Sequence, residues 1–170
     1  PEPIVCPAYW NPPTLVYLAQ RNGFDLESLI FCFAIGGIGA ACYRVMTVAP
    51  EMIIDHAERR SGRHRWHWVS LAIPFPTFFL SLFFPWNPIY PALLAMFAGA
   101  LAAALCRPDL LVHSLWGGMI FLGLYLVFLL GLRWLWPGYI ESVWTLPEVL
   151  PCHPVGPPLG DLFFGFGFGL

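Results

Sequence analysis

Two carboxylates, Glu27 and Asp161, each stand about one turn into a strongly apolar stretch, where they are best placed to do chemistry. Carboxylates within or at the rim of a membrane segment are costly to bury, so their presence usually has a functional reason. Facing each other across a helix bundle, they could share a proton, with desolvation favouring the neutral acid. A neutral carboxylic acid in an apolar pocket can protonate an alkene. The alternative is that both are first-turn acids that compensate a helix dipole at the interface.

The two acids stand in similar local sequences. Residues 25–31 read Asp-Leu-Glu-Ser-Leu-Ile-Phe, and residues 158–164 read Pro-Leu-Gly-Asp-Leu-Phe-Phe. Each copy continues into an apolar, glycine-containing segment that is predicted to be helical. Each copy also follows a proline-rich segment, or lead, and the two leads are of nearly equal length. Leucine and glycine matches arise readily by chance in apolar sequences, but the shared order favours an internal repeat with both copies in one orientation.

The composition is that of an integral membrane protein. Hydrophobic residues make up 58% of the chain and charged residues 11%, whereas soluble domains average roughly a quarter charged. Five of the eight basic residues lie between Arg44 and Arg65, but Glu51, Asp55 and Glu58 lie among them, so nucleic-acid binding has little support. No Walker loop, GxGxxG, HExxH or GxSxG pattern occurs, which leaves nucleotide hydrolysis and classical hydrolase chemistry without support.

The hydrophobic pattern predicts an all-α, polytopic helix bundle with four full membrane spans and the start of a fifth. The expected spans are residues 26–46, 68–84, 89–106, 110–132 and 159–170. Asp25 suits the N-cap of the first span, and Pro74 and Pro76 should kink the second. The last segment would rise only about 18 Å against roughly 30 Å of hydrocarbon. Since the chain also begins without methionine, we expect a single membrane domain, 1–170, that is a fragment of a longer protein.

Loop charges predict the orientation of these spans. The arginine-rich connection 47–67 is assigned to the cytoplasm, and Arg107 in the next loop but one agrees with that side. The proline-rich leads 1–24 and 134–158 would then be external, and both acid motifs would open on the external side. The loop charges suit a bacterial inner membrane.

Small residues at helical spacing predict close contacts between helices. Such faces could also support a homo- or hetero-oligomer, while membrane lipid and an apolar substrate are the other expected partners; nucleic acid is not expected. The small residues are Gly36 and Ala40 in the first span, Ala95, Gly99 and Ala103 in the third, and Gly165 and Gly169 in the last.

Two groups of possible metal donors occur, although we expect neither a metal nor another cofactor. A His-rich basic loop is more often a solvated connection that faces lipid headgroups. The leads could instead form a disulfide or a partial metal site, but both are short of ligands. The donors are Glu51, Asp55, His56, His64 and His67 in the basic loop, and Cys6, Cys152 and His153 in the leads.

The sequence around the acids resembles a family motif. Residues 158–164 resemble the Pro-Leu-Glu-Glu-x-x-Phe motif of the small membrane-embedded lycopene cyclases, the heterodimeric or fused type found in actinobacteria, archaea and fungi. Residues 25–31 look like a second, weaker copy. Each copy keeps one of the two adjacent acids, Glu27 at the first place and Asp161 at the second. Ser28 and Gly160 replace the others, so two half-motifs would have to assemble one acid pair.

The resemblance implies a duplicated multi-span domain that acts as an isomerase, or intramolecular lyase, of carotenoid biosynthesis. In that reaction an acid protonates the terminal double bond of lycopene and the cation closes to an ionone ring, without redox change and without a cofactor. Glu27 and Asp161 would be the catalytic pair, and the long isoprenoid would enter sideways from lipid.

Aromatic residues near the acids are candidates for substrate binding. Phe31, Phe164 and Phe166 could line the pocket, since aromatic faces stabilise a carbocation as they attract other cations. The ordinary alternative for these three rings is helix packing or contact with lipid. The alternative function for the whole chain is a non-enzymatic membrane protein, either a small-molecule transporter or an assembly subunit.

Overall fold

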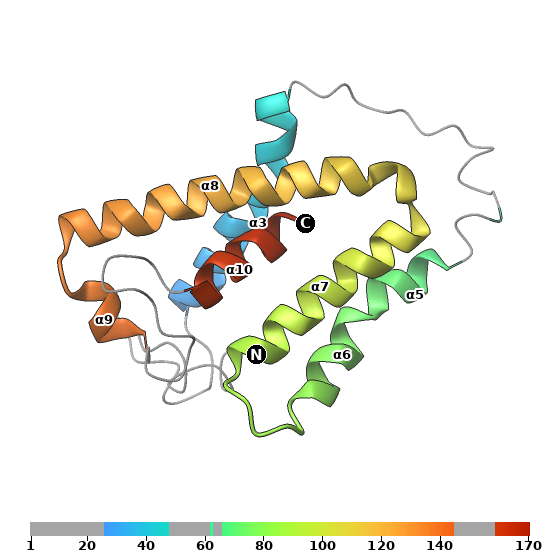
Figure 1. Ribbon diagram of the computed structural model, residues 1–170, viewed down its shortest axis with the longest axis horizontal. Coiled ribbons are helices and arrows are strands. Elements are labelled where there is room, and N and C mark those ends of the chain that lie inside the picture. The colour runs from blue at the N-terminus through green and yellow to red at the C-terminus, as the bar shows by residue number, and fades with distance from the viewer. Residues whose placement is uncertain (1–25, 48–61, 63–65, 145–158) are drawn as a thin grey trace.

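The computed structural model describes residues 26–47, 62, 66–144 and 159–170, and its elements are helices (Figure 1). The all-α class predicted from the sequence is confirmed for these residues. The elements are α3 (Leu26–Thr47), α5 (His67–Ala72), α6 (Pro74–Ser81), α7 (Ile89–Cys106), the 3-10 turn η2 (Pro108–Leu110), α8 (Leu111–Leu135), α9 (Tyr139–Val143) and α10 (Leu159–Gly169).

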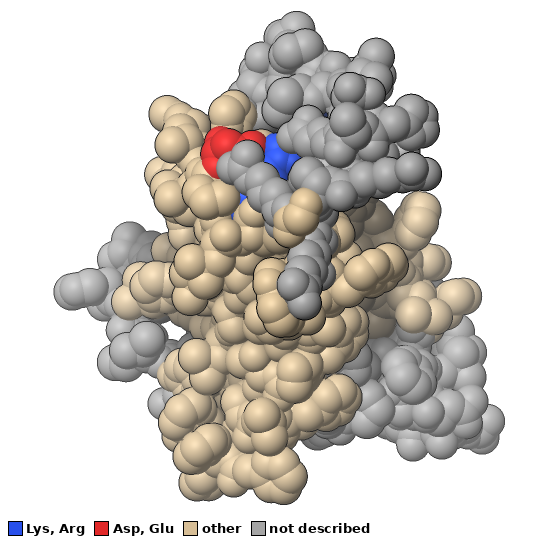
Figure 2. All heavy atoms as spheres, turned by 90° about the vertical axis from the view of Figure 1, so that its right-hand side faces the viewer, with Lys and Arg blue, Asp and Glu red and all other residues tan. Residues whose placement is uncertain are grey.

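Two of the described helical stretches are long and apolar enough to cross a membrane, judged by length and composition. They are α7 and the stretch Pro108–Leu135, which contains η2 and α8. Only 28% of the first and 22% of the most apolar part of the second are buried, unlike the core helix of a soluble protein. On the face shown in Figure 2, charged side chains of the described residues gather in one small area. These features suggest a membrane protein.

The four full spans predicted from the sequence are not confirmed. The apolar parts of α3 (Leu26–Cys42) and α10 are shorter apolar helices. The stretch predicted as one span, residues 68–84, is divided at Ile73 into α5 and α6, because Pro74 has no backbone N–H to continue the helix. The hydroxyl of Thr77 donates a hydrogen bond of 2.8 Å to the Ile73 carbonyl, which also accepts the backbone N–H of Thr77.

The internal repeat is not confirmed either. The helix that follows the first acid motif, α3, has 22 residues, whereas α10 has 11 in the described range. Their surroundings also differ, since most of the side chains of α3 are exposed while Gly160, Asp161, Gly165 and Gly167 of α10 are buried.

The helix α10 lies between α7 and α8 and packs on both of them (Figure 1). The paired short helices α5 and α6 cover the other side of α7, and α3 packs against α8. A small core forms where α7 begins: Ile89 and Leu93 are buried, and Tyr90, Phe97, Trp144 and Phe164 pack around them. This arrangement buries Gly160 and Asp161 of the acid motif in the interior of the described structure.

Glycines allow α8 and α10 to approach each other closely. A Cβ atom on Gly118 of α8 would lie 2.8 Å from the Phe166 ring and 3.1 Å from the Phe166 carbonyl oxygen. At the end of α10, a Cβ on Gly169 would lie 2.6 Å from the Gly117 carbonyl oxygen. Since real Cβ atoms do not approach backbone that closely, side chains at these positions would push the helices apart. The α8–α10 seam, defined by these contacts, therefore depends on glycine.

We predict that Gly118→Ala lowers the free energy of unfolding by about 1–3 kcal/mol, because the methyl group overpacks the seam. The matched control is Gly123→Ala on the same helix, where nothing lies within 4 Å of an added Cβ. That variant should be unchanged or gain up to about 1 kcal/mol from helix propensity. Thermal unfolding of both variants in detergent micelles measures the difference, and equal stability of the two would contradict the glycine seam.

Candidate functional site

Asp161 is the carboxylate most withdrawn from solvent among the described residues with a stated burial. It lies in the first turn of α10, its side chain is 2% exposed, and its Oδ2 atom is shielded from solvent. The helix start favours an acid there, because backbone N–H groups and the helix dipole point their positive ends toward it. Burial in apolar surroundings disfavours the carboxylate relative to the neutral acid, so the position suits a group that holds and donates a proton.

Tyr125 of α8 packs directly on α10 at Gly165. A Cβ on Gly165 would lie 2.8, 3.1 and 3.2 Å from Cδ1, Cγ and Cβ of Tyr125, so the tyrosine passes directly over the glycine. Gly165 follows Asp161 by about one turn on the same face of α10.

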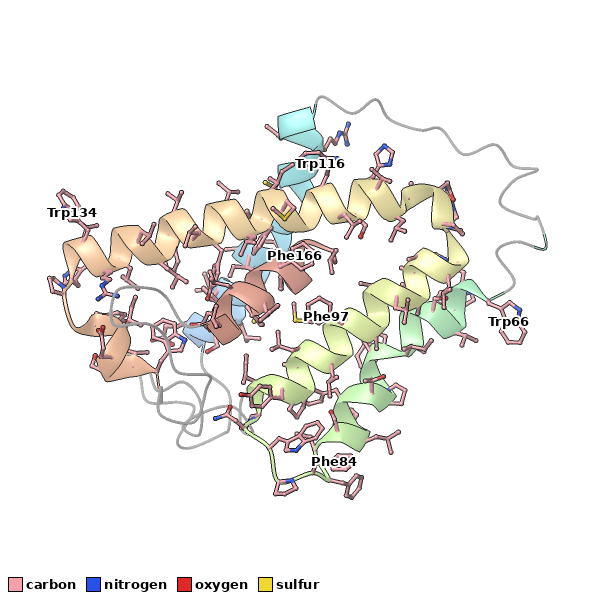
Figure 3. All side chains as sticks on the ribbon, viewed as in Figure 1. Trp66, Phe84, Phe97, Trp116, Trp134 and Phe166 are labelled. Atoms are coloured by element: carbon pink, nitrogen blue, oxygen red, sulfur yellow. The ribbon has the colours of Figure 1, made fainter. Side chains whose placement is uncertain are left out.

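A continuous series of aromatic rings lies along the α8–α10 seam. Each ring contacts the next with centroids 5.1–6.4 Å apart, a spacing typical of attractive aromatic pairs. A further pair, Phe97 of α7 and Phe166 of α10, lies 6.3 Å apart in the space between their helices (Figure 3). The series runs from Phe128 through Tyr125, Phe164 and Phe168 to Phe121.

The three phenylalanines that are predicted to bind substrate have different surroundings in the structure. Phe164 contacts Tyr125 and the core around Ile89 and Leu93. Phe166 packs on Gly118, so both rings lie at the α8–α10 seam near the acid. Phe31 is 40% exposed on α3. A substrate-binding role for all three stays a prediction.

Sequence reasoning did not single out Tyr125. The signal was available, because it is the only tyrosine in the apolar helix α8 and its hydroxyl needs a polar neighbour when buried. What the sequence does not contain is the pairing of this residue with Gly165, which depends on how α8 and α10 approach.

Glu27 lies in the first turn of α3, half-buried, with its Oε2 atom shielded from solvent. The contact of α3 with α10 occurs later in both helices, where a Cβ on Gly39 would lie 3.2 Å from the Phe168 ring. Glu27 precedes that contact by about three turns and Asp161 precedes it by about two. The beginnings of α3 and α10 point toward the same edge of the molecule in Figure 1. The pairing of the two acids stays a prediction.

The metal and disulfide alternatives concern residues that are mostly outside the described part of the chain. Within that part, no group of three or more His, Cys, Asp or Glu side chains is placed to hold a metal ion. His67 is described at the start of α5. The following lie outside the described residues: Asp25, Glu51, Asp55, His56, His64, Cys6, Cys152, His153, the lead 1–24 and most of the loop 47–67.

Comparison with known proteins identifies one family. Residues 87–170, nearly half of the chain, match the family model described as lycopene cyclase. The matched region begins just before α7 and contains α8, α10 and Asp161, whereas α3 and Glu27 lie outside it. The family resemblance predicted from residues 158–164 is thereby confirmed. No curated protein and no solved structure matches the chain.

We predict that Phe164→Ala lowers the free energy of unfolding by about 2–3 kcal/mol, somewhat less than a fully buried phenylalanine, since this ring is partly buried. The control is Phe33→Ala on α3, where the ring is 86% exposed and truncation should change stability by less than about 0.5 kcal/mol. Chemical unfolding in detergent, followed by tryptophan fluorescence, compares the two. A larger loss for Phe33→Ala would show that the aromatic series does not hold the seam together.

Proposed function

Because residues 87–170 carry a lycopene cyclase family domain, we propose that this protein cyclises a long apolar isoprenoid of the carotenoid class. The observation that carries the proposal is the burial of Asp161: within the matched region it is a buried carboxyl group on α10, the helix whose Phe164 belongs to the aromatic series. This combination supports acid-catalysed ring closure, a non-redox isomerisation.

The proposed reaction begins when neutral Asp161 donates its proton to the terminal double bond of the substrate. The O–H bond of the acid breaks, a C–H bond forms, and positive charge develops on the neighbouring carbon. A second double bond of the same molecule attacks that carbon and closes the ring. Loss of a proton from the cyclic cation to a carboxylate then restores the acid, so atoms and electrons balance without an oxidant or reductant. In this scheme Glu27 is the second carboxyl group.

The aromatic rings of the seam are suited to the charged intermediate. The faces of Tyr125, Phe164 and Phe166 carry partial negative charge, which attracts a cation without supplying a nucleophile that could trap it. The exclusion of water matters for the same reason, because water would add to the cation and give an alcohol. The buried position of Asp161 supports such a dry site.

We further propose that the protein lies in the bacterial inner membrane, with the basic loop 47–67 on the cytoplasmic side and a four-span bundle completed around the site. Exposed tryptophans support the interfacial positions: Trp66 is 62% and Trp134 81% exposed, and they lie at opposite edges of the molecule in Figure 3. Tryptophan prefers the two membrane–water interfaces. The apolar substrate would then reach the seam sideways from lipid.

A non-enzymatic transporter is the second candidate, and one observation favours it. The helix break between α5 and α6 at Ile73 and Pro74 is the kind of discontinuity on which transporters build ion and substrate sites. A transporter would tolerate loss of the Asp161 acid without changing the pigments of the cell, whereas a cyclase would not.

The test is expression of the full-length gene in a lycopene-accumulating bacterium, with the extracted pigments separated by chromatography. We predict new cyclised pigments that fall about 100-fold or more in Asp161→Asn, because general acid catalysis contributes roughly 10²–10⁴ in rate. Glu141→Gln is the matched control, since that acid is exposed on α9. Unchanged lycopene, with the protein shown to be in the membrane, would rule out lycopene cyclisation by this protein alone.

The same assay tests the second acid separately. If Glu27 exchanges a proton with the substrate or with Asp161, Glu27→Gln should also lower cyclised pigment by about 100-fold. Full activity of Glu27→Gln beside an inactive Asp161→Asn would assign the acid chemistry to the matched region and leave Glu27 as a first-turn acid that stabilises α3.

A further inference from the structure

The two helices of the α8–α10 seam are antiparallel. A Cβ on Gly169 would lie 2.6 Å from Cβ of Phe121. A Cβ on Gly165, one turn earlier in α10, would lie 2.8 Å from Cδ1 of Tyr125, which is one turn later in α8. The beginning of α10, which carries Asp161, therefore points toward the end of α8 and toward the segment that follows it.

The segment after α8 turns and packs on the protein. Gly138 has a φ of 85° and allows the chain to turn between α8 and α9, because glycine adopts this backbone conformation without a Cβ clash. The side chains of Ile140 and Val143 on α9 are 5% and 4% exposed, whereas Glu141 and Ser142 are exposed. The helix α9 therefore presents an apolar side to the protein and a polar side away from it.

Trp144, which follows α9, extends this apolar side. It packs on the core that Ile89 and Leu93 form at the beginning of α7, and Phe164 of α10 packs on the same core. Residues 139–144, here named the α9 cover, therefore bridge the end of α8 and the beginning of α7. Since α10 packs on both of those helices, its beginning points toward the gap that the cover bridges (Figure 1).

We propose that the α9 cover keeps water from the beginning of α10 and so decides the product of the reaction. The inference rests on the proposed cyclase function, in which the cation must meet the second double bond before it meets water. With the cover open, water attacks the first cation. A C–O bond then forms, an O–H bond of that water breaks, and the released proton returns to the carboxylate of Asp161. The product is a hydrated, acyclic carotenoid, formed without redox change.

The first turn of α10 can report whether water arrives there. The first four N–H groups of a helix have no acceptor within the helix, so contacts outside the helix and access of water govern their exchange with deuterium. Gly160 and Asp161 in this turn are buried. Their backbone amides therefore provide a local readout that does not depend on the substrate.

The first measurement is hydrogen–deuterium exchange of the full-length protein in lipid nanodiscs, followed by mass spectrometry of peptides that cover residues 159–165. Trp144→Ala removes the indole from the core, and exchange at the beginning of α10 should become about 10-fold faster or more through local opening. Peptides from the middle of α8 should stay protected, since the glycine contacts of the seam are unchanged. Trp134→Ala is the matched control, because that indole is 81% exposed on α8.

The second measurement is the pigment pattern in a lycopene-accumulating bacterium, where a hydrated pigment is recognised by the added mass of one water. In Trp144→Ala the ratio of hydrated to cyclised pigment should rise by about 10-fold or more, because local opening admits water. Trp144→Phe keeps a large ring in the core and should restore both ring closure and slow exchange. Val143→Ala loosens α9 but keeps the indole, so it replaces Trp144→Ala if that variant does not fold. It should change both readouts in the same direction.

The outcomes separate this inference from the proposed function. Unchanged exchange and an unchanged pigment ratio in the variants of Trp144 and Val143 would overturn the cover, while the acid role of Asp161 would stand. Faster exchange with cyclised pigment only would also overturn it, because water would then reach α10 without deciding the product. If the wild-type protein forms no cyclised pigment, the proposed function fails, and the exchange measurement alone decides whether the α9 cover excludes water.

Discussion

The close approach of α10 to α8 is the constraint on which the rest of the described structure depends. It is possible because Gly118, Gly165 and Gly169 leave no side chain between the helices. At Gly169 the approach is to backbone, since an added Cβ would lie 2.6 Å from the Gly117 carbonyl oxygen. Without this seam α10 would not be buried, and Asp161 would lose the desolvated position that distinguishes it from an ordinary first-turn acid.

The aromatic rings of the seam pack the helices, and under the proposed function the same surfaces would also serve the chemistry. The series from Phe128 to Phe121 joins α8 and α10, which is the ordinary role of large rings between helices. Under the proposed function, its apolar faces would also contribute the environment that an acid needs in order to protonate a hydrocarbon. The two roles do not compete, since a ring edge can pack against one neighbour while its face remains attractive to a cation.

The broken helix beside α7 shows how small residues are matched to a particular neighbour. A Cβ on Gly99 would lie 2.7 Å from Cγ of Pro74, so the proline that divides α5 from α6 is also the group that occupies the notch in α7. The Thr77 hydroxyl donates to the Ile73 carbonyl just before that proline. The spacing of Ala95, Gly99 and Ala103 predicts a close contact, and the tertiary structure identifies a short, interrupted helix as one of the neighbours there.

Sequence alone was sufficient for the helical class, the bounds of α7 and α8 within a few residues, and the family resemblance through residues 158–164, because local apolar patterns and short motifs carry that information. It did not predict the division of residues 68–84, since a proline can either kink a helix or end it. Tertiary structure alone decided that Phe164 and Phe166 lie at the seam while Phe31 is exposed on α3. It also decided that Tyr125 packs on Gly165 of α10, because a contact between distant segments depends on which glycine leaves room for a side chain of the other helix.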